Sequence, residues 1–201
     1  MEQQGTHAWG KSHIGKRRVS NEDRFMVRHL ENEQGILLAV ADGMGGEAGG
    51  EVAAQIVVDF LERCQISGNA TEKDLSRNLE QANEKILQRA EAETGLKGMG
   101  TTATVVLVRR ETAYWSHVGD SRLYHFRRGS LEQISSDHTF VQDLVAEGTL
   151  TREEADRHPL RNMLDQCVGC GTLKAESGRL ALMAGDRLLL CSDGLTKHLP
   201  D

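Results

Sequence analysis

The sequence predicts an α+β domain, because helix-like and strand-like patterns occupy separate stretches of the chain. Residues 50–64 and 71–93 place apolar side chains at the spacing of amphipathic helices. From residue 101 the pattern changes to short β-rich runs separated by glycine or charged turns. These runs are typical of an antiparallel meander, so strands are expected to dominate the second half of the chain.

A buried strand is expected ahead of the first helix, since GILLAVAD at residues 35–42 is a short and continuous apolar run. The second helix has a start pattern in Thr71 and Asp74, and glycines from Gly95 onward end it. The meander is expected in four runs, TTATVVLV, TAYWSHVGD, SRLYHFRRG and SLEQIS.

A polar, helical insertion at about residues 135–163 predicts a surface flap. Its first helix stops at Gly148, and Thr151 with Glu154 forms a capping box for a second helix. Two strands joined by the tripeptide AGD follow within residues 178–193. No repeat or linker interrupts the chain, so residues 1–201 are expected to form a single domain that includes this flap.

The composition excludes several classes of function. The 201 residues carry a net charge of −6, which argues against binding to nucleic acid or to an anionic membrane. No apolar stretch approaches the roughly 20 residues that a membrane helix needs. The N-terminal residues lack the apolar segment of a secretory signal, so a cytoplasmic protein is expected.

The cysteines are Cys64, Cys167, Cys170 and Cys191. The CVGC sequence has the CxxC spacing of a zinc knuckle or a redox pair. A zinc site would require a second such pair or a histidine partner motif, and the sequence contains neither. Ordinary reduced thiols are therefore expected, ahead of a metal or redox role.

Three apolar runs end in an aspartate that is followed by a small turn residue. The three are Asp42, Asp120 and Asp193. Turn chemistry explains any one of them, because Asp-Gly is a favoured turn dipeptide. Three together, with no cationic residue next to any, favour a shared divalent cation that relieves the repulsion between carboxylates. Carboxylate and carbonyl oxygens suit Mg²⁺ or Mn²⁺ better than zinc.

The glycine-rich loop after Asp42 has a second interpretation. GMGGEA, at residues 43–48, matches the G-x-G-x-x-A pattern of a dinucleotide-binding turn. The carboxylate of Asp42 would face the pyrophosphate, and the acidic strand end expected about 20 residues later is absent. That region is the helix around Asp59, so the nucleotide-binding alternative is disfavoured.

Upstream, GKRRVSNEDRF combines an arginine pair with Asn21, Glu22 and Asp23. The planar guanidinium of arginine suits a phosphate dianion. Taken alone, however, the stretch is best explained as a solvated run of charges.

Five motifs occur in the order and approximate spacing of one family: RVSNED, ADGMGGEAGGEVAA, GMGTTAT, HVGDSRLY and CSDGLT. From about Gly10 to its end, the sequence resembles the metal-dependent Ser/Thr protein phosphatases (PPM, type 2C), and most of all their compact bacterial members. The resemblance implies a four-layer αββα sandwich of two antiparallel sheets flanked by helices. Metal ions are then expected between the sheets at one edge.

The resemblance also implies metal ligands. Asp42 matches the carboxylate that bridges two ions, and the carbonyl of Gly43 is expected to bind one of them. Asp193 resembles a ligand of the other ion. Asp120, together with Asp193, matches the residues that hold a third ion in bacterial members. The cofactor is expected to be Mn²⁺ or Mg²⁺, as two ions with a possible third.

Other site residues are implied in the same way. Arg18 matches the arginine that grips the substrate phosphate, and Glu22 with Asp23 matches the acidic pair that orders metal-bound waters. Thr101 and Thr102 match structural positions near the site.

The implied activity is hydrolysis of phosphoserine and phosphothreonine in proteins. A hydroxide formed on the metal ions attacks directly, without a covalent intermediate. Phosphorylated proteins are the expected substrates, and the enzyme would oppose a bacterial Ser/Thr kinase. The alternative is a non-catalytic module on the same fold that binds phosphoproteins or another partner.

Two departures from the family pattern affect these expectations. Met44 occupies the position of a histidine that serves eukaryotic relatives as a possible general acid, so the general acid is unassigned. The family also continues into final strands with an Asp-Asn pair, and Asp201 lies too early to be that aspartate. The last strands and one ligand are therefore expected to be missing, with weakened metal binding. The QCVGCG stretch, at residues 166–171, differs from relatives without a physical explanation.

Overall fold

The computed structural model describes residues 6–16, 18–31, 35–45 and 49–199. Two features of the sequence therefore lie outside the described residues: the end of the glycine loop, residues 46–48, and Asp201.

The strands form two antiparallel sheets, as expected for an α+β protein of this kind. The first sheet has the order β1-β2-β4-β5-β8, and β3 pairs with the end of β2. The second sheet has the order β7-β6-β9. The first sheet consists of β1 (Asp23–Leu30), β2 (Gly35–Met44), β3 (Gly100–Thr101), β4 (Ala103–Arg109), β5 (Thr112–Val118) and β8 (Glu176–Ala181). The second consists of β6 (Arg122–Arg127), β7 (Ser130–Gln133) and β9 (Arg187–Cys191).

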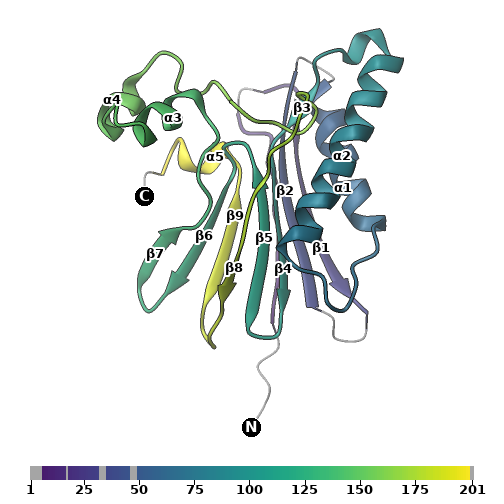
Figure 1. Cartoon of the computed structure of the whole chain (residues 1–201), viewed down its shortest axis with the longest axis vertical. Coiled ribbons are helices and arrows are strands. Elements are labelled where there is room, and N and C mark those ends of the chain that lie inside the picture. The colour runs from purple at the N-terminus through teal and green to yellow at the C-terminus, as the bar shows by residue number, and fades with distance from the viewer. Residues whose placement is uncertain (1–5, 17, 32–34, 46–48, 200–201) are drawn as a thin grey trace.

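Two long helices, α1 (Gly49–Arg63) and α2 (Glu72–Ala92), cover the outer face of the first sheet (Figure 1). The start of α2 confirms the expected capping pattern, since Thr71 and Asp74 form a reciprocal capping box. A short 3₁₀ turn, Thr94–Leu96, follows α2. Within the described part of the chain, long helices cover the first sheet only.

Strand β4 shows how the layers are held together. Successive side chains of a strand point to opposite faces. Val105 and Leu107 belong to the core between the first sheet and the helices, whereas Val106 and Val108 belong to the core between the two sheets. Burial of each such side chain contributes about 1.5–3 kcal/mol. The continuous apolar run in β4 therefore reflects two buried faces.

The single meander predicted for the second half of the chain is wrong in one respect. Strands β4 and β5 pair in the first sheet, but β6 pairs with β7 and β9 in the second. The chain changes sheets in the turn at Gly119, whose φ of 107° favours glycine. Strands β8 and β9 are likewise consecutive but belong to different sheets. Each change of sheet separates two runs that local pattern alone would join.

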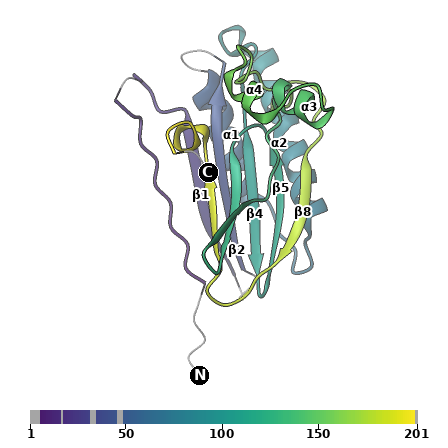
Figure 2. The same cartoon turned by 90° about the vertical axis from the view of Figure 1, so that its left-hand side faces the viewer.

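The short helices gather at one end of the sheets (Figure 1). They are α3 (Phe140–Ala146) and α4 (Arg152–Arg157) in the expected flap, and α5 (Asp193–Thr196) after β9. Thr151 and Glu154 form the predicted capping box of α4. Figure 2 shows the N-terminal segment running in extended form beside the sheets before it turns back into β1. No helix among the described residues is long and apolar enough to cross a membrane.

Candidate metal centre

The ends of β1 and β2 bring two carboxylates face to face. In the antiparallel ladder, Asp23 at the start of β1 is the register partner of Asp42 near the end of β2. Like charges directly opposite each other destabilise a sheet. The side chain of Asp23 is held on its other side by Ser192, whose hydroxyl donates to Oδ2 at 3.0 Å. The pairing therefore places an unfavourable charge contact at the edge of the fold.

Asp120 and Asp193 complete a cluster of four acids. Burial of the carboxyl group, followed by the charges of Asp23, Asp193 and Asp120, raises the pKa of Asp42 to about 8. Burial, with repulsion from Asp193 and Asp137, raises the pKa of Asp120 to about 6. The three aspartates that end apolar runs in the sequence are thus brought together from two sheets, and Asp23 joins them.

The backbone of Asp42 is fixed by two threonines. The amide of Asp42 donates to Oγ1 of Thr102 at 2.9 Å. Its carbonyl accepts from the amide of Thr102 and from the hydroxyl of Thr101, each at 2.9 Å. The hydroxyl of Thr102 also lies 2.7 Å from that of Ser121, next to Asp120. Buried threonines therefore connect the strand that carries Asp42 to the turn that carries Asp120.

A close approach between two backbones explains part of the glycine-rich sequence. A Cβ atom on Gly43 would lie 2.1 Å from the carbonyl oxygen of Gly50, in the first turn of α1. Only glycine allows the end of β2 to pack so closely against this helix. The pattern that resembles a dinucleotide-binding turn thus has a packing role here.

Lys197 corrects one expectation. The sequence interpretation found no cation beside any of the three aspartates, but the ammonium of Lys197 contacts the carboxylate of Asp193 one turn along α5. The side chain of Lys197 remains 46% exposed, so this ammonium can move into water when another cation binds. Asp42 and Asp23 face other acids and a hydroxyl.

Arg18 and Glu22 lie beside the acidic cluster. Nη1 of Arg18 is 3.7 Å from Oε2 of Glu22, and the Arg18 side chain is 56% exposed. A groove of about 1640 Å³ is lined by Arg18, Asp23, Asp42 and Asp193, among others. The exposed guanidinium of Arg18 thus lines the same groove as the acids and is accessible to an anion such as a phosphate.

The donor set fits Mg²⁺ or Mn²⁺. Every candidate ligand offers oxygen, which these hard cations prefer. Burial, and after it the neighbouring carboxylates, raise the pKa of Asp42, and a divalent ion bound there would offset both effects. Asp23, Asp42, Asp120 and Asp193 are therefore the residues able to hold metal ions at this edge.

The structure also contains features that the sequence interpretation missed. The sulfur atoms of Cys167 and Cys170 lie against each other in the CVGC loop, while Cys64 and Cys191 are free. The amide of Val168, inside the CVGC sequence, donates to Thr101 at 2.8 Å, which ties this loop to β3. A second polar cluster, His117 with His138 and Glu176, had no sequence pattern to reveal it.

Solved structures of the same shape define the class of protein. A bacterial serine phosphatase structure is 37% identical to this chain, with a TM-score of 0.85 over 94% of this chain and 78% of that one. A structure of the catalytic domain of the serine/threonine protein phosphatase PstP in complex with two manganese ions is 39% identical. Its TM-score is 0.81, and the match covers 95% of this chain and 79% of that one.

The match to a family model extends over nearly the whole chain. The model described as Protein phosphatase 2C matches residues 9–201, and the chain therefore belongs to that family. The full-length serine/threonine protein phosphatase PstP of Mycobacterium tuberculosis is 41% identical over 194 residues, or 92% of this chain. The chain spans 37% of the length of that relative.

Proposed function

We propose that this chain is a protein-serine/threonine phosphatase that uses Mn²⁺ or Mg²⁺. The observation that carries the proposal is the cluster of four acids in which the pKa of Asp42 rises to about 8. Membership of the Protein phosphatase 2C family supports it, as does the relative whose structure contains two manganese ions.

The ligand roles are those that the family resemblance implies, and the cluster of acids at the strand ends supports them. Asp42, the carbonyl of Gly43 and Asp193 would hold two ions, and Asp120 together with Asp193 would hold a third. When bound, the ions lower the pKa of a coordinated water and neutralise charge on the phosphoryl group. The four carboxylates, which repel one another without a cation, supply the attraction for these ions.

The remaining site residues bind the substrate phosphate and orient water. Arg18 holds the substrate phosphate, because its exposed guanidinium can donate two parallel hydrogen bonds to phosphate oxygens. Glu22 and Asp23 accept hydrogen bonds from water in the groove and so fix its orientation. Attack by water is direct, and no side chain of the protein becomes phosphorylated. Met44 offers no proton, so none of these assignments includes a general acid.

Release of phosphate from a phosphothreonine peptide in Mn²⁺ tests the proposal. The wild-type chain should release phosphate, and EDTA or the Asp42→Asn variant should abolish release. Asp59→Asn is the matched control, since Asp59 lies on α1 and is bonded to Gln55, away from the acidic cluster. Activity that persists in Asp42→Asn or in EDTA would contradict the proposal. Binding of the phosphopeptide without release would instead support the non-catalytic alternative.

Four further statements belong to the proposal. Residues 1–201 act as one domain, and the flap at 135–163 shapes the choice of substrate because α3 and α4 lie at the same end of the sheets as α5 (Figure 1). The partners are phosphorylated proteins, including a Ser/Thr kinase that the enzyme opposes in signal transduction. The protein acts in the cytoplasm. Peptide preference after exchange of the flap, and fractionation of cells that express the protein, test these statements.

A further inference from the structure

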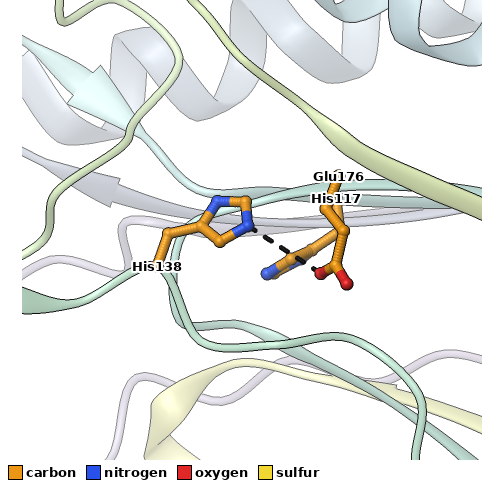
Figure 3. A group of neighbouring side chains, drawn as sticks. All are labelled: His117, His138 and Glu176. Atoms are coloured by element: carbon orange, nitrogen blue, oxygen red, sulfur yellow. Dashed lines mark ion pairs between the residues drawn. The ribbon is translucent and has the colours of Figure 1, made fainter. Parts of the chain in front are cut away.

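His117, His138 and Glu176 form a polar cluster (Figure 3). His117 lies on β5, His138 in the first part of the flap, before α3, and Glu176 on β8. One potential ligand atom from each residue lies within 4.8 Å of the others. The cluster is therefore either a second metal site or a hydrogen-bonded support, and the proton positions on the two rings decide between these.

Both ring nitrogens of His117 have a hydrogen-bond partner. Its Nε2 lies 3.0 Å from the carbonyl oxygen of Gly119, and its Nδ1 lies 2.9 Å from the hydroxyl of Thr104. A carbonyl only accepts, so Nε2 carries the proton and Nδ1 accepts from Thr104. Complete burial, together with the neighbouring His138, lowers the pKa of His117 to about 3, so the ring is neutral.

His138 contacts the same glycine from the opposite side. Its backbone amide donates to the carbonyl of Gly119 at 2.8 Å, and the amide of Gly119 donates to its Nδ1 at 3.3 Å. Because Nδ1 accepts, the proton of the neutral ring is on Nε2, which points toward Oε2 of Glu176 at 3.8 Å (Figure 3). That oxygen of Glu176 also accepts from the amide of Ser136 at 2.9 Å.

These proton positions argue against a second metal site. A histidine binds a metal through a nitrogen without a proton. Nε2 of each ring carries its proton, and each Nδ1 accepts a hydrogen bond from another group. The cluster instead surrounds the backbone of Gly119, whose carbonyl and amide are both bonded to histidines.

Gly119 controls the position of Asp120. It has a φ of 107°, and a Cβ atom there would lie 2.6 Å from Cγ2 of Thr102. The chain passes from the first sheet to the second at this turn, between the end of β5 at Val118 and the start of β6 at Arg122. Whatever fixes the peptide groups of Gly119 therefore fixes the direction in which Asp120 presents its carboxylate.

We propose that His138 is a positioning residue for Asp120, acting through Gly119, whose amide donates to the His138 ring, and that the Glu176 carboxylate on the far side of the ring favours this orientation. The consequence for metal binding rests on the proposed function of the acidic edge. His138 immediately precedes Thr139, the N-cap of α3, so it also joins the start of the flap to the metal centre.

Mn²⁺ binding measured by calorimetry tests the proposal. His138→Ala should weaken binding of the Mn²⁺ ion that Asp120 holds by about 10- to 100-fold. Loss of a residue that orients a metal ligand has an effect of this size. The double variant His138→Ala/Asp120→Asn should bind no more weakly than Asp120→Asn alone. His138→Asn should recover much of the affinity, because its Oδ1 can take the place of Nδ1 and accept from Gly119. His29→Ala, on the exposed end of β1, is the matched control.

Other outcomes would overturn the proposal. Additive losses in the double variant, or equal losses in His138→Ala and His138→Asn, would show that His138 acts only through general stability. Tight Zn²⁺ binding that Glu176→Ala removes would show that the imidazoles are metal ligands. Nitrogen NMR of His138 in the metal-free protein should find the proton on Nε2, and a proton on Nδ1 would contradict the assignment.

Two further results distinguish a failure of this proposal from misfolding and from a failure of the proposed enzyme activity. If His138→Ala does not fold, Glu176→Ala and His138→Asn carry the test, and unchanged Mn²⁺ binding in Glu176→Ala would remove Glu176 from the proposal. If the wild-type chain binds Mn²⁺ but releases no phosphate, the proposed enzyme activity fails while the role of His138 in metal binding stands.

Discussion

The two ends of strand β9 carry aspartates in different electrostatic surroundings. Asp186 precedes the strand, and its side chain is only 6% exposed. It accepts hydrogen bonds from Arg127, and Nε2 of His125 lies 3.1 Å away. These hydrogen bonds, first of all from Arg127, hold the pKa of Asp186 well below its usual range. Asp193 follows the strand at its other end, where it contacts the half-exposed Lys197 and faces the charges of Asp42 and Asp120.

The difference shows how this fold separates structural acids from site acids. At Asp186 a guanidinium within the protein neutralises the carboxylate, and the contact holds the turn between β8 and β9. At the other end, the acids repel one another, and the pKa of Asp42 moves upward instead of downward. Perturbation of this kind, by burial and like charges, is typical of functional sites.

Exchange of each aspartate for asparagine should give the largest contrast. Asp193→Asn should lower phosphate release in Mn²⁺ by more than about 100-fold. Loss of a residue that only hydrogen-bonds to a metal ligand already lowers metal affinity or activity about 10- to 100-fold. Asp186→Asn should retain near wild-type activity at a temperature where it is folded. Initial rates with a phosphothreonine peptide measure both. Equal losses in the two variants would remove the distinction between the ends of β9.

Arg18→Ala should mainly weaken substrate binding. A guanidinium–phosphate interaction contributes about 1.5–3 kcal/mol, so KM should rise roughly 10- to 100-fold. Arg128→Ala, in the exposed β6–β7 turn, is the control and should leave KM unchanged. An unchanged KM for Arg18→Ala would show that the substrate phosphate is bound elsewhere.

The pH dependence of stability that Asp42 contributes should have the opposite sign to that of Asp186. The pKa of Asp42 in the folded protein, about 8, lies above the ordinary value of 3.8. Between these values the folded protein retains a proton that the unfolded chain has lost, so the metal-free protein should lose stability as pH rises from about 4 to 8. Asp42→Asn should flatten this slope in urea unfolding experiments. A slope that Asp42→Asn leaves unchanged would contradict the assigned shift.

Asp186 contributes in the opposite sense. Because its pKa is lowered on folding, its contribution is present above its ordinary pKa of 3.8 and is lost as pH falls below that value. Asp186→Asn should therefore lower the melting temperature at neutral pH and change it less in acid.

Lys197→Gln should produce the smallest effect. Lys197 competes with metal ions for the carboxylate of Asp193, and its side chain is 46% exposed. An exposed ion pair contributes about 0.2–1 kcal/mol, so Mn²⁺ should bind up to about fivefold more tightly to the variant. Calorimetry measures this change, and weaker binding would mean that Lys197 supports the metal centre.

Much of the acidic edge was predictable because strand ends are local features. An apolar run that ends in Asp42, Asp120 or Asp193 marks a carboxylate at the edge of a sheet, whichever sheet receives the strand. The pairing of Asp23 with Asp42 was not predictable from pattern alone, since it depends on the register between β1 and β2. The positions of the acids followed from the sequence, and their mutual contacts required the fold.

Other parts depended on contacts that no local pattern records. The move of β6 into the second sheet depends on the turn at Gly119 and on packing of Leu123 between the sheets. His117 resembles an ordinary buried strand residue until Gly119 and Thr104 are placed around it. Lys197 was overlooked because its contact with Asp193 requires the helical turn of α5.

Thermal unfolding with and without Mn²⁺ tests the central claim most directly, namely that the acids around Asp42 are left unneutralised for a divalent ion. At pH 7.5 without metal, Asp42→Asn should melt at a higher temperature than the wild-type chain, because the folded wild type must either keep a proton on Asp42 that the unfolded chain has lost or bury its charge beside other acids, and the amide needs neither. Saturating Mn²⁺ should raise the melting temperature of the wild type and have much less effect on Asp42→Asn. A wild type that does not respond to Mn²⁺, or an equal response in the two proteins, would contradict the claim.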